Sequence, residues 1–238
     1  MNGTVEIVDD ADALASALAD LVIDRLSTRL QEAPTCSLVL AGGSTPRRAY
    51  ELLSQGVRRE AVDWSKVEIL FGDERCVPPT DPDSNYRMAR ESLFDRLPIA
   101  STNILRMRGE ADPAKAASEY AQIIVDRFGN QPRFDVVLLG MGPDGHTASL
   151  FPGSDPFAQN ERLARALYSQ SKSQWRLTLT PRALNSGSTI AIALAGSEKA
   201  AVFTAIRRDK GDPVTYPITA ISPTDGQLIW LIDRSVAA

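Results

Sequence analysis

The residues best suited to chemistry lie in one glycine-rich loop within the stretch DVVLLGMGPDGHTASLFPGS, residues 135–154. His146 is the only histidine of the chain, and Asp144 lies two residues before it. A neutral imidazole can take a proton from water and later return it to a leaving oxygen. A lone histidine is more often structural, but this one follows glycines and an apolar run and has an aspartate beside it. We therefore expect His146 and Asp144 to be catalytic residues.

A second glycine-rich turn, Gly42-Gly43-Ser44-Thr45, follows the apolar run 37–41 and precedes a helix predicted to begin at Pro46. Glycines allow close backbone approach, and free N–H groups, the helix dipole and two hydroxyls suit a bound anion such as phosphate. The alternative is a tight strand-to-helix turn in which Thr45 caps the helix. The lysine of a P-loop is missing, which argues against an NTPase.

Charged residues follow two further apolar runs. Asp73 and Arg75 come directly after the run 67–71, and Lys199 follows the run 189–194 near the start of a predicted helix. Arginine supplies the fixed positive charge that a phosphate or carboxylate needs, and a lysine near a helix N-terminus indicates an anion nearby. The alternatives are a solvated loop with a local pair between Arg75 and a carboxylate, and an ordinary surface lysine.

The glycines 140, 142 and 145 also match G-x-G-x-x-G, the fingerprint of dinucleotide-binding proteins. That fingerprint opens a helix and is followed about 20 residues later by an acidic residue. Here Pro152 and Gly153 interrupt the chain, and the acid at a suitable distance, Glu161, lies in NERLARALYS, which has the composition of a helix. We therefore expect no nicotinamide cofactor.

Short apolar runs alternate with amphipathic segments, which is typical of an α/β fold with a largely parallel sheet. We predict one domain over residues 1–238, with ligands at the carboxyl ends of the strands. The predicted strands are Val5–Val8, Ser37–Ala41, Val67–Phe71, Phe134–Leu139, Arg176–Thr180, Thr189–Leu194 and Gln227–Ile232. The predicted helices are Asp10–Leu30, Pro46–Leu53, Asn85–Leu97, Pro113–Phe128 and Glu198–Arg207.

Composition excludes several classes of function. The net charge of -4 gives no support to a nucleic-acid partner, and no stretch has the length of a membrane span. Cys36 and Cys76 are the only cysteines; they fit no metal-ligand spacing, and the N-terminus lacks a targeting pattern. We expect a cytoplasmic protein without metal that performs acid–base chemistry on a small phosphorylated molecule, with an activated ester as a suitable substrate.

Six blocks extend this expectation to a family. In order, they are AGGSTPRRAYELL, FGDERCVPPTDPDSNYRMARESLF, DVVLLGMGPDGHTASLFPGS, RLTLTPRALNSG, AGSEKAAVF and PITAISPTDGQLIWLID. These blocks are distributed over nearly the whole chain, and in their order it resembles the 6-phosphogluconolactonase family. The most specific parts are DERxVP followed by SN, and DGHTASLFPGS.

The resemblance implies a modified Rossmann-like fold with helices on both faces, no cofactor, and hydrolysis of 6-phosphoglucono-δ-lactone in the pentose phosphate pathway. It implies that His146 is the general base and that Asp144 positions either His146 or the substrate. The phosphate ligands that it implies are Arg75, Lys199 and the Gly42–Thr45 loop, with Asp73 as a further substrate-binding residue and Arg176 as another candidate. The implied partner is a sugar-phosphate lactone, and the expected assembly is a monomer or small homo-oligomer.

Two related functions are alternatives. Glucosamine-6-phosphate deaminases have a similar loop, GNDGHIAFNEP, with a glutamate five residues after the histidine, where this chain has Phe151. They also have a tyrosine in place of Arg75. The second alternative is a sugar-phosphate sensor that binds without catalysis, which the presence of both Asp144 and His146 disfavours.

Overall fold

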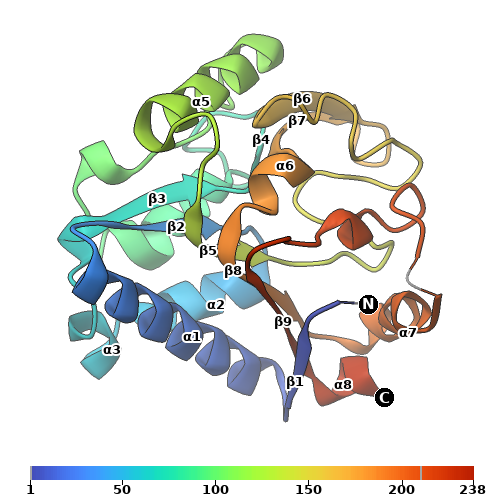
Figure 1. Ribbon diagram of the computed structural model, residues 1–238, viewed down its shortest axis with the longest axis horizontal. Helices are drawn as coiled ribbons and strands as arrows, with labels where there is room; N and C mark the ends of the chain where they lie inside the picture. The colour runs from blue at the N-terminus through green and yellow to red at the C-terminus, as the bar shows by residue number, and fades with distance from the viewer. Residues whose placement is uncertain (1, 210) are drawn as a thin grey trace.

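A parallel sheet of six strands forms the centre of the computed structural model, which describes residues 2–209 and 211–238 (Figure 1). Its strand order is β1-β9-β8-β5-β2-β3, and each neighbouring pair is parallel. The strands are β1 (Thr4–Val8), β2 (Cys36–Leu40), β3 (Val67–Phe71), β5 (Phe134–Leu139), β8 (Gly187–Leu194) and β9 (Gln227–Asp233). The predicted parallel α/β fold is confirmed, and the ends of these six strands differ from the prediction by at most two residues.

A second, antiparallel sheet has the order β4-β7-β6. It consists of β4 (Asp73–Arg75), β6 (Ala164–Ser169) and β7 (Gln174–Leu179). The predicted strand 176–180 is therefore present, but outside the parallel sheet. The prediction of a helix in residues 160–169 is wrong, because β6 pairs with β7 along its whole length. Alanine, leucine and arginine are good helix formers, but propensity is a weak guide to structure and tertiary pairing overrides it here.

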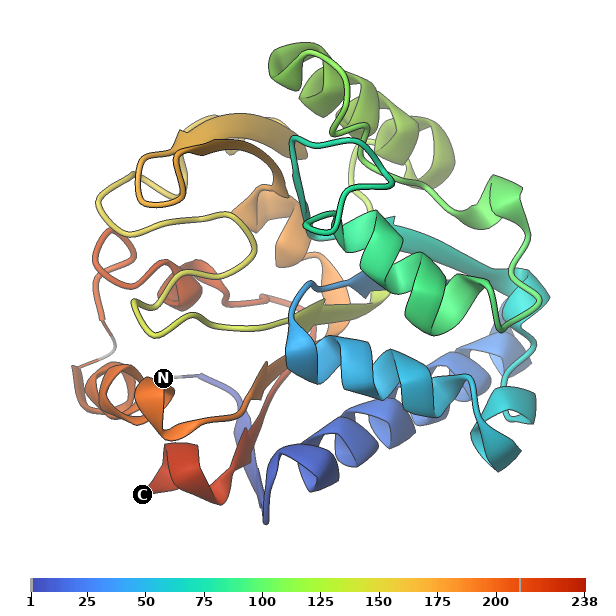
Figure 2. The ribbon, with the colours of Figure 1, turned by 180° about the vertical axis from the view of Figure 1, so that it is seen from behind.

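Helices flank the parallel sheet. In Figures 1 and 2, α1 and α2 lie side by side below it, and α5 lies above it beside the second sheet. The helices are α1 (Ala11–Glu32), α2 (Ser44–Leu53), α3 (Gly56–Glu60), α4 (Asn85–Ala89), α5 (Pro113–Phe128), α6 (Pro181–Leu184), α7 (Ala200–Asp209) and α8 (Arg234–Ala237). The 3-10 turns are Trp64–Lys66, Ser101–Asn103, Ser197–Lys199 and Pro217–Ala220.

Three predicted helices differ from the structure in detail. The expected helix 85–97 is α4 followed by a π-helical turn, Arg90–Phe94, and it ends early. The helix predicted to begin at Glu198 begins as a 3-10 turn, and α7 starts at Ala200. The alternative in which Thr45 caps α2 is wrong: Gly43 is the cap, with φ of 105°, and Thr45 lies in the first helical turn.

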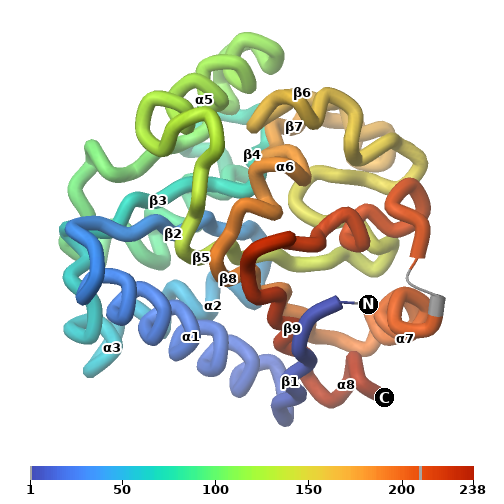
Figure 3. Tube along the Cα trace, in the orientation of Figure 1, coloured from blue at the N-terminus to red at the C-terminus, as the bar shows by residue number. Residues whose placement is uncertain are grey.

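The two ends of the chain lie near one another, as the trace in Figure 3 shows. The reason is that β1 pairs with β9 at the edge of the parallel sheet. Every residue of β2 and of the edge strand β3 is buried, which is the usual state of parallel strands that are covered on both faces. The strands that carry the candidate site residues therefore belong to the rigid core.

Two buried tyrosine hydroxyls hold the ends of β2 and β3. Tyr50 of α2 accepts the Ala41 N–H at 3.0 Å and donates to the Ala41 carbonyl at 2.9 Å. Tyr120 of α5 does the same for Phe71, at 2.8 and 3.2 Å. Burial raises the pKa of both hydroxyls, so they remain protonated donors. These bonds replace ladder contacts at the points where the chain leaves the sheet for the candidate site.

Removing either hydroxyl should therefore destabilise the protein. We expect Tyr50→Phe and Tyr120→Phe each to lower the free energy of unfolding by about 1–3 kcal/mol, because two buried backbone groups lose their partner. Urea denaturation measures the change. Tyr168→Phe, at an exposed tyrosine, is the matched control and should change stability by less than about 0.5 kcal/mol. Equal stability of all three variants would contradict the proposed role of the hydroxyls.

Candidate functional site

Four loops meet at the carboxyl edge of the parallel sheet because their strands are neighbours. The strands β8, β5, β2 and β3 are adjacent and parallel. Lys199 follows β8, the loop of His146 follows β5, the Gly42–Thr45 turn follows β2, and β4 follows β3. Ligands of open α/β sheets bind at this edge. Segments far apart in the sequence are thus brought to one place by the strand order.

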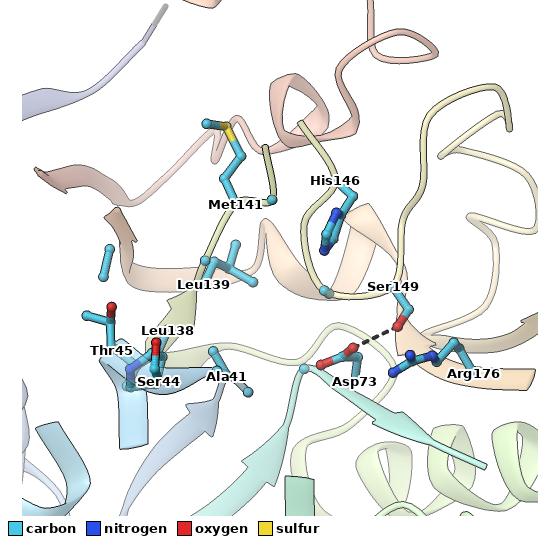
Figure 4. A pocket seen from close by; sticks show the side chains of 18 of the residues that line it. Ala41, Ser44, Thr45, Asp73, Leu138, Leu139, Met141, His146, Ser149 and Arg176 are labelled. Atoms are coloured by element: carbon cyan, nitrogen blue, oxygen red, sulfur yellow. Dashed lines mark hydrogen bonds between the residues drawn. The ribbon is translucent and has the colours of Figure 1, made fainter. Parts of the chain in front are cut away.

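A cavity of about 340 Å³ lies among these loops (Figure 4). Ser44 and Thr45 lie on one side of it, Asp73 and Arg176 lie on the other, and His146 lies above them. The cavity is lined by nine of the ten predicted site residues: Gly42, Gly43, Ser44, Thr45, Asp73, Arg75, His146, Arg176 and Lys199. The tenth, Asp144, contacts the His146 ring instead.

Asp144 orients the His146 imidazole. One Asp144 carboxylate oxygen, Oδ1, lies 2.5 Å from His146 Nδ1 and also accepts the backbone N–H of His146 at 3.1 Å. Partial burial raises the pKa of Asp144, but the bonds from His146 outweigh it and leave the pKa below its ordinary value. Because the carboxylate is ionised, it favours a proton on Nδ1, which leaves Nε2 as the basic nitrogen. This is the arrangement of a general base with an orienting acid.

Packing also fixes the imidazole. A Cβ atom on Gly142 would overlap the ring, so only glycine fits at this position. On another side lies Phe151, with ring centroids 5.1 Å apart and planes inclined by 38°. The loop is closed by the bond from the Gly142 N–H to the His146 carbonyl at 2.9 Å. Gly142 therefore leaves the space that the His146 ring occupies.

Asp73 is held in a fixed orientation at the opposite wall. Its carboxylate accepts the Ser149 hydroxyl at 2.7 Å (Figure 4) and the Asn85 side-chain amide at 3.1 Å. The same amide donates to the Asp73 carbonyl at 2.9 Å. A Cβ atom on Gly42 would overlap the Asn85 amide, which explains the glycine. Asn85 thus connects the Gly42–Thr45 turn to β4.

Glu74, the residue between Asp73 and Arg75, is buried and organises the chain around it. Its carboxylate accepts three backbone N–H groups, of Arg75, Asn85 and Tyr86, each at 2.8 Å, and the Ser84 hydroxyl at 3.0 Å. Burial raises its pKa, while the three N–H bonds lower it. The alternative of a solvated loop with an Arg75 ion pair is therefore wrong: the segment 73–75 is a strand.

Two arginines face each other across the second sheet. Arg75 of β4 pairs directly with Arg176 of β7, and both side chains line the cavity. Like charges at opposed positions are unfavourable. The buried Nε atom of each has no hydrogen-bond partner among the described residues, although Arg75 donates to the Asp83 carbonyl. Burial, and then the charge of Arg75, lower the pKa of Arg176. Two guanidinium groups in this arrangement have the charge and the donors to bind an anion.

Three cations without an ion-pair partner among the described residues line this cavity. Within residues 2–209 and 211–238, no carboxylate forms an ion pair with Arg75, Lys172 or Arg176, and all three line the cavity. Lys199 donates to the Ala195 carbonyl at 2.8 Å and lies 3.9 Å from Glu198. Among the residues that the structure describes, the cavity thus has four cationic side chains, Arg75, Lys172, Arg176 and Lys199, and one lining carboxylate, that of Asp73.

Other reactive groups contribute little here. Burial raises the pKa of the Cys36 thiol to about 12 and that of the Cys76 thiol to about 11, so neither is a thiolate near neutral pH. Among the residues that the structure describes, no three His, Cys, Asp or Glu side chains form a group able to hold a metal ion. None of the described helices is long and apolar enough to span a membrane.

Sequence reasoning missed Ser149 and Lys172, and it considered Phe151 only as a difference from the deaminases. The bond from Ser149 to Asp73 joins residues 76 positions apart, and no local pattern indicates it. Lys172 lies in a turn, where side chains have no periodicity. The dipeptide Ser84-Asn85 was an available signal for the contact between Asn85 and Asp73, because polar residues at a predicted helix start often form specific hydrogen bonds.

The fold and the cavity together define an α/β protein with a strand-end site for a small anionic ligand. Residues 9–230 match the family model described as glucosamine-6-phosphate isomerases/6-phosphogluconolactonase. The chain belongs to this family.

Individual relatives agree with the family match. A 6-phosphogluconolactonase of Nostoc sp. is 35% identical over 100% of this chain and 98% of its own length. The crystal structure of a 6-phosphogluconolactonase from Thermotoga maritima is 29% identical, with a TM-score of 0.84, and the match covers 98% of this chain and 100% of that chain. A solved monomeric glucosamine-6-phosphate deaminase has a TM-score of 0.84 at 21% identity, covering 98% of both chains, which shows the common fold alone.

The opposed arginines lead to a prediction that separates stability from binding. We expect Arg176→Gln to leave the melting temperature unchanged or higher without ligand, because one of two repelling charges is removed. Inorganic phosphate should raise the melting temperature of the wild type, and do so clearly less in the variant. Thermal unfolding with and without phosphate measures both effects. The control is Arg162→Gln, at an exposed arginine outside the cavity. An equal phosphate response in all three proteins would contradict the assignment.

Proposed function

We propose that this chain hydrolyses 6-phospho-D-glucono-1,5-lactone to 6-phospho-D-gluconate, a step of the oxidative pentose phosphate pathway, with His146 as general base. The observation that carries the proposal is the Asp144–His146 pair beside a cavity with three unpaired cations. A dianionic phosphate complements those cations. His146, the proposed base, lines the same cavity and can therefore lie next to the carbonyl of a bound lactone. The names of the relatives over the full chain support the same substrate.

Binding in this proposal begins with the phosphate. The Gly42–Thr45 turn, on the other side of the cavity, and Lys199, which follows β8, form a second group of anion donors. Arg75 and Arg176 supply positive charge to the phosphate oxygens from the wall of the second sheet. These contacts are remote from the lactone carbonyl, so their free energy is used to orient C1 toward His146. Asp73, held by Ser149 and Asn85, is a fixed acceptor for a sugar hydroxyl.

The chemical steps then need one base. His146 Nε2 takes a proton from water as the water oxygen forms a bond to C1, and the carbonyl becomes a tetrahedral oxyanion. The ionised Asp144 stabilises the imidazolium through Nδ1. When the bond from C1 to the ring oxygen breaks, the imidazolium returns its proton to that oxygen. The product is an open-chain carboxylic acid, which loses its remaining proton to solvent and becomes the carboxylate, and no covalent enzyme intermediate is required.

Activity assays distinguish the proposed lactonase from the two alternatives, a sensor and a deaminase. In the proposed reaction, wild-type protein accelerates hydrolysis of fresh lactone above the spontaneous rate, followed through 6-phosphogluconate dehydrogenase and NADP⁺. A sensor would bind the lactone without acceleration. A deaminase would release ammonia from glucosamine 6-phosphate, but the apolar Phe151 ring occupies the position of that family's glutamate and packs on His146.

His146→Ala tests the base directly. We expect kcat to fall by about 10²–10⁴-fold with KM changed by less than about twofold, because general base catalysis is lost and the phosphate contacts remain. The coupled assay measures both constants. Calorimetric titration with 6-phosphogluconate is the control for an intact binding site. A large rise in KM with kcat unchanged would rule out His146 as the base.

Asp144→Asn tests whether Asp144 acts through His146. The amide has nearly the shape of the carboxylate but no charge, so we expect kcat to fall at least about tenfold with little change in KM. Since both groups serve one step, the double variant with His146→Ala should be no slower than His146→Ala alone. Additive losses, or a raised KM in Asp144→Asn, would instead place Asp144 on the sugar. The lowered pKa of Asp144 keeps it ionised at neutral pH, so its protonation should add no inflection there.

A further inference from the structure

The turn between β6 and β7 places a lysine over the candidate site. Lys172 lies in this turn, residues 170–173, and is exposed, yet its side chain lines the cavity. An exposed lysine normally has its ammonium in bulk water or near a surface carboxylate. Lys172 forms no ion pair within the described residues and reaches toward a cavity that already contains two unpaired arginines. Its position therefore adds a third unpaired cation to the lining of one cavity.

The strand register gives the cavity a direction. Thr178 of β7 accepts the Ser149 N–H at 3.3 Å, so this part of β7 lies beside the loop of His146. Arg176, opposite Arg75, is two residues farther along the strand, or about 7 Å. The turn with Lys172 continues in the same direction, beyond both arginines. Along β7 the cavity thus runs from a reacting end near His146 to a cationic end near Lys172.

We propose that Lys172 is a further substrate-binding residue, whose ammonium binds the substrate phosphate from the solvent side of the cavity. This inference rests on the proposed function, since it takes the substrate to be a sugar-phosphate lactone. Arg75 and Arg176 contact the anion from the wall that the second sheet forms. A phosphate has three terminal oxygens that accept hydrogen bonds from several directions. A flexible lysine at the mouth can bind an oxygen that faces away from that wall and cover the anion once it has entered.

Steady-state kinetics test this role. We expect Lys172→Ala to raise KM for 6-phosphogluconolactone about tenfold with kcat changed by less than about twofold, the size of one charge-assisted hydrogen bond. Lys172→Arg should keep most of the affinity, because it retains the charge. The matched control is Lys115→Ala, at an exposed lysine of α5 that is paired with Glu119 and lies outside the cavity; its KM should equal that of the wild type. An unchanged KM in Lys172→Ala overturns the proposal.

Binding without turnover identifies the group that Lys172 contacts. Calorimetric titration uses D-sorbitol 6-phosphate, which has the phosphate but no carboxylate, and D-gluconate, which has the carboxylate but no phosphate. We expect Lys172→Ala to weaken only the binding of sorbitol 6-phosphate. Weaker binding of gluconate alone would place Lys172 on the product carboxylate and overturn the proposal. Because neither probe is hydrolysed, this result is independent of whether the wild type accelerates lactone hydrolysis, which tests the proposed function.

Discussion

The buried carboxylate of Glu74 determines the shape of the candidate site. Four donors from residues 75–86 converge on it, so an irregular segment of the chain is folded around one side chain. This segment carries Asn85, which holds Asp73 and packs against Gly42. Asp73 in turn accepts the hydroxyl of Ser149, three residues after His146. A charge that would be costly to bury alone is satisfied by these donors, and the three loops of the cavity acquire a fixed relation.

The cavity itself is electrostatically unfavourable without a ligand. Arg75 and Arg176 repel each other across β4 and β7, and neither has a carboxylate in an ion pair within the described chain. Folding tolerates this repulsion because the surrounding core is large and well packed. An anion bound between them would offset the repulsion, and part of the free energy of the proposed phosphate binding would then come from this relief. Sites that trade stability for binding in this way are common in enzymes.

Sequence reasoning succeeded where signals are local. The strands of the parallel sheet are mostly short apolar runs, which the sequence shows directly. Asp144 and His146 lie two residues apart, although the sequence left open whether Asp144 contacts the imidazole or the substrate. Strand-end positions for the Gly42–Thr45 turn and Arg75 followed from the general geometry of parallel sheets. It failed for β6, whose composition favours a helix while its pairing with β7 decides the outcome. The bond of Ser149 to Asp73 and the reach of Lys172 depend on tertiary placement, which no periodicity encodes.

The pairing of β4 with β7 limits how this chain can vary in length. Side chains of a strand alternate between its two faces, and Thr178 and Arg176 share the face that meets Asp73 and Arg75. One residue inserted between them would turn Arg176 away from the cavity. Insertions in β7 are therefore tolerated only in pairs, whereas a change in the length of the turn would move Lys172 and leave both arginines in place. Where relatives have insertions within this strand, the insertions should therefore contain an even number of residues.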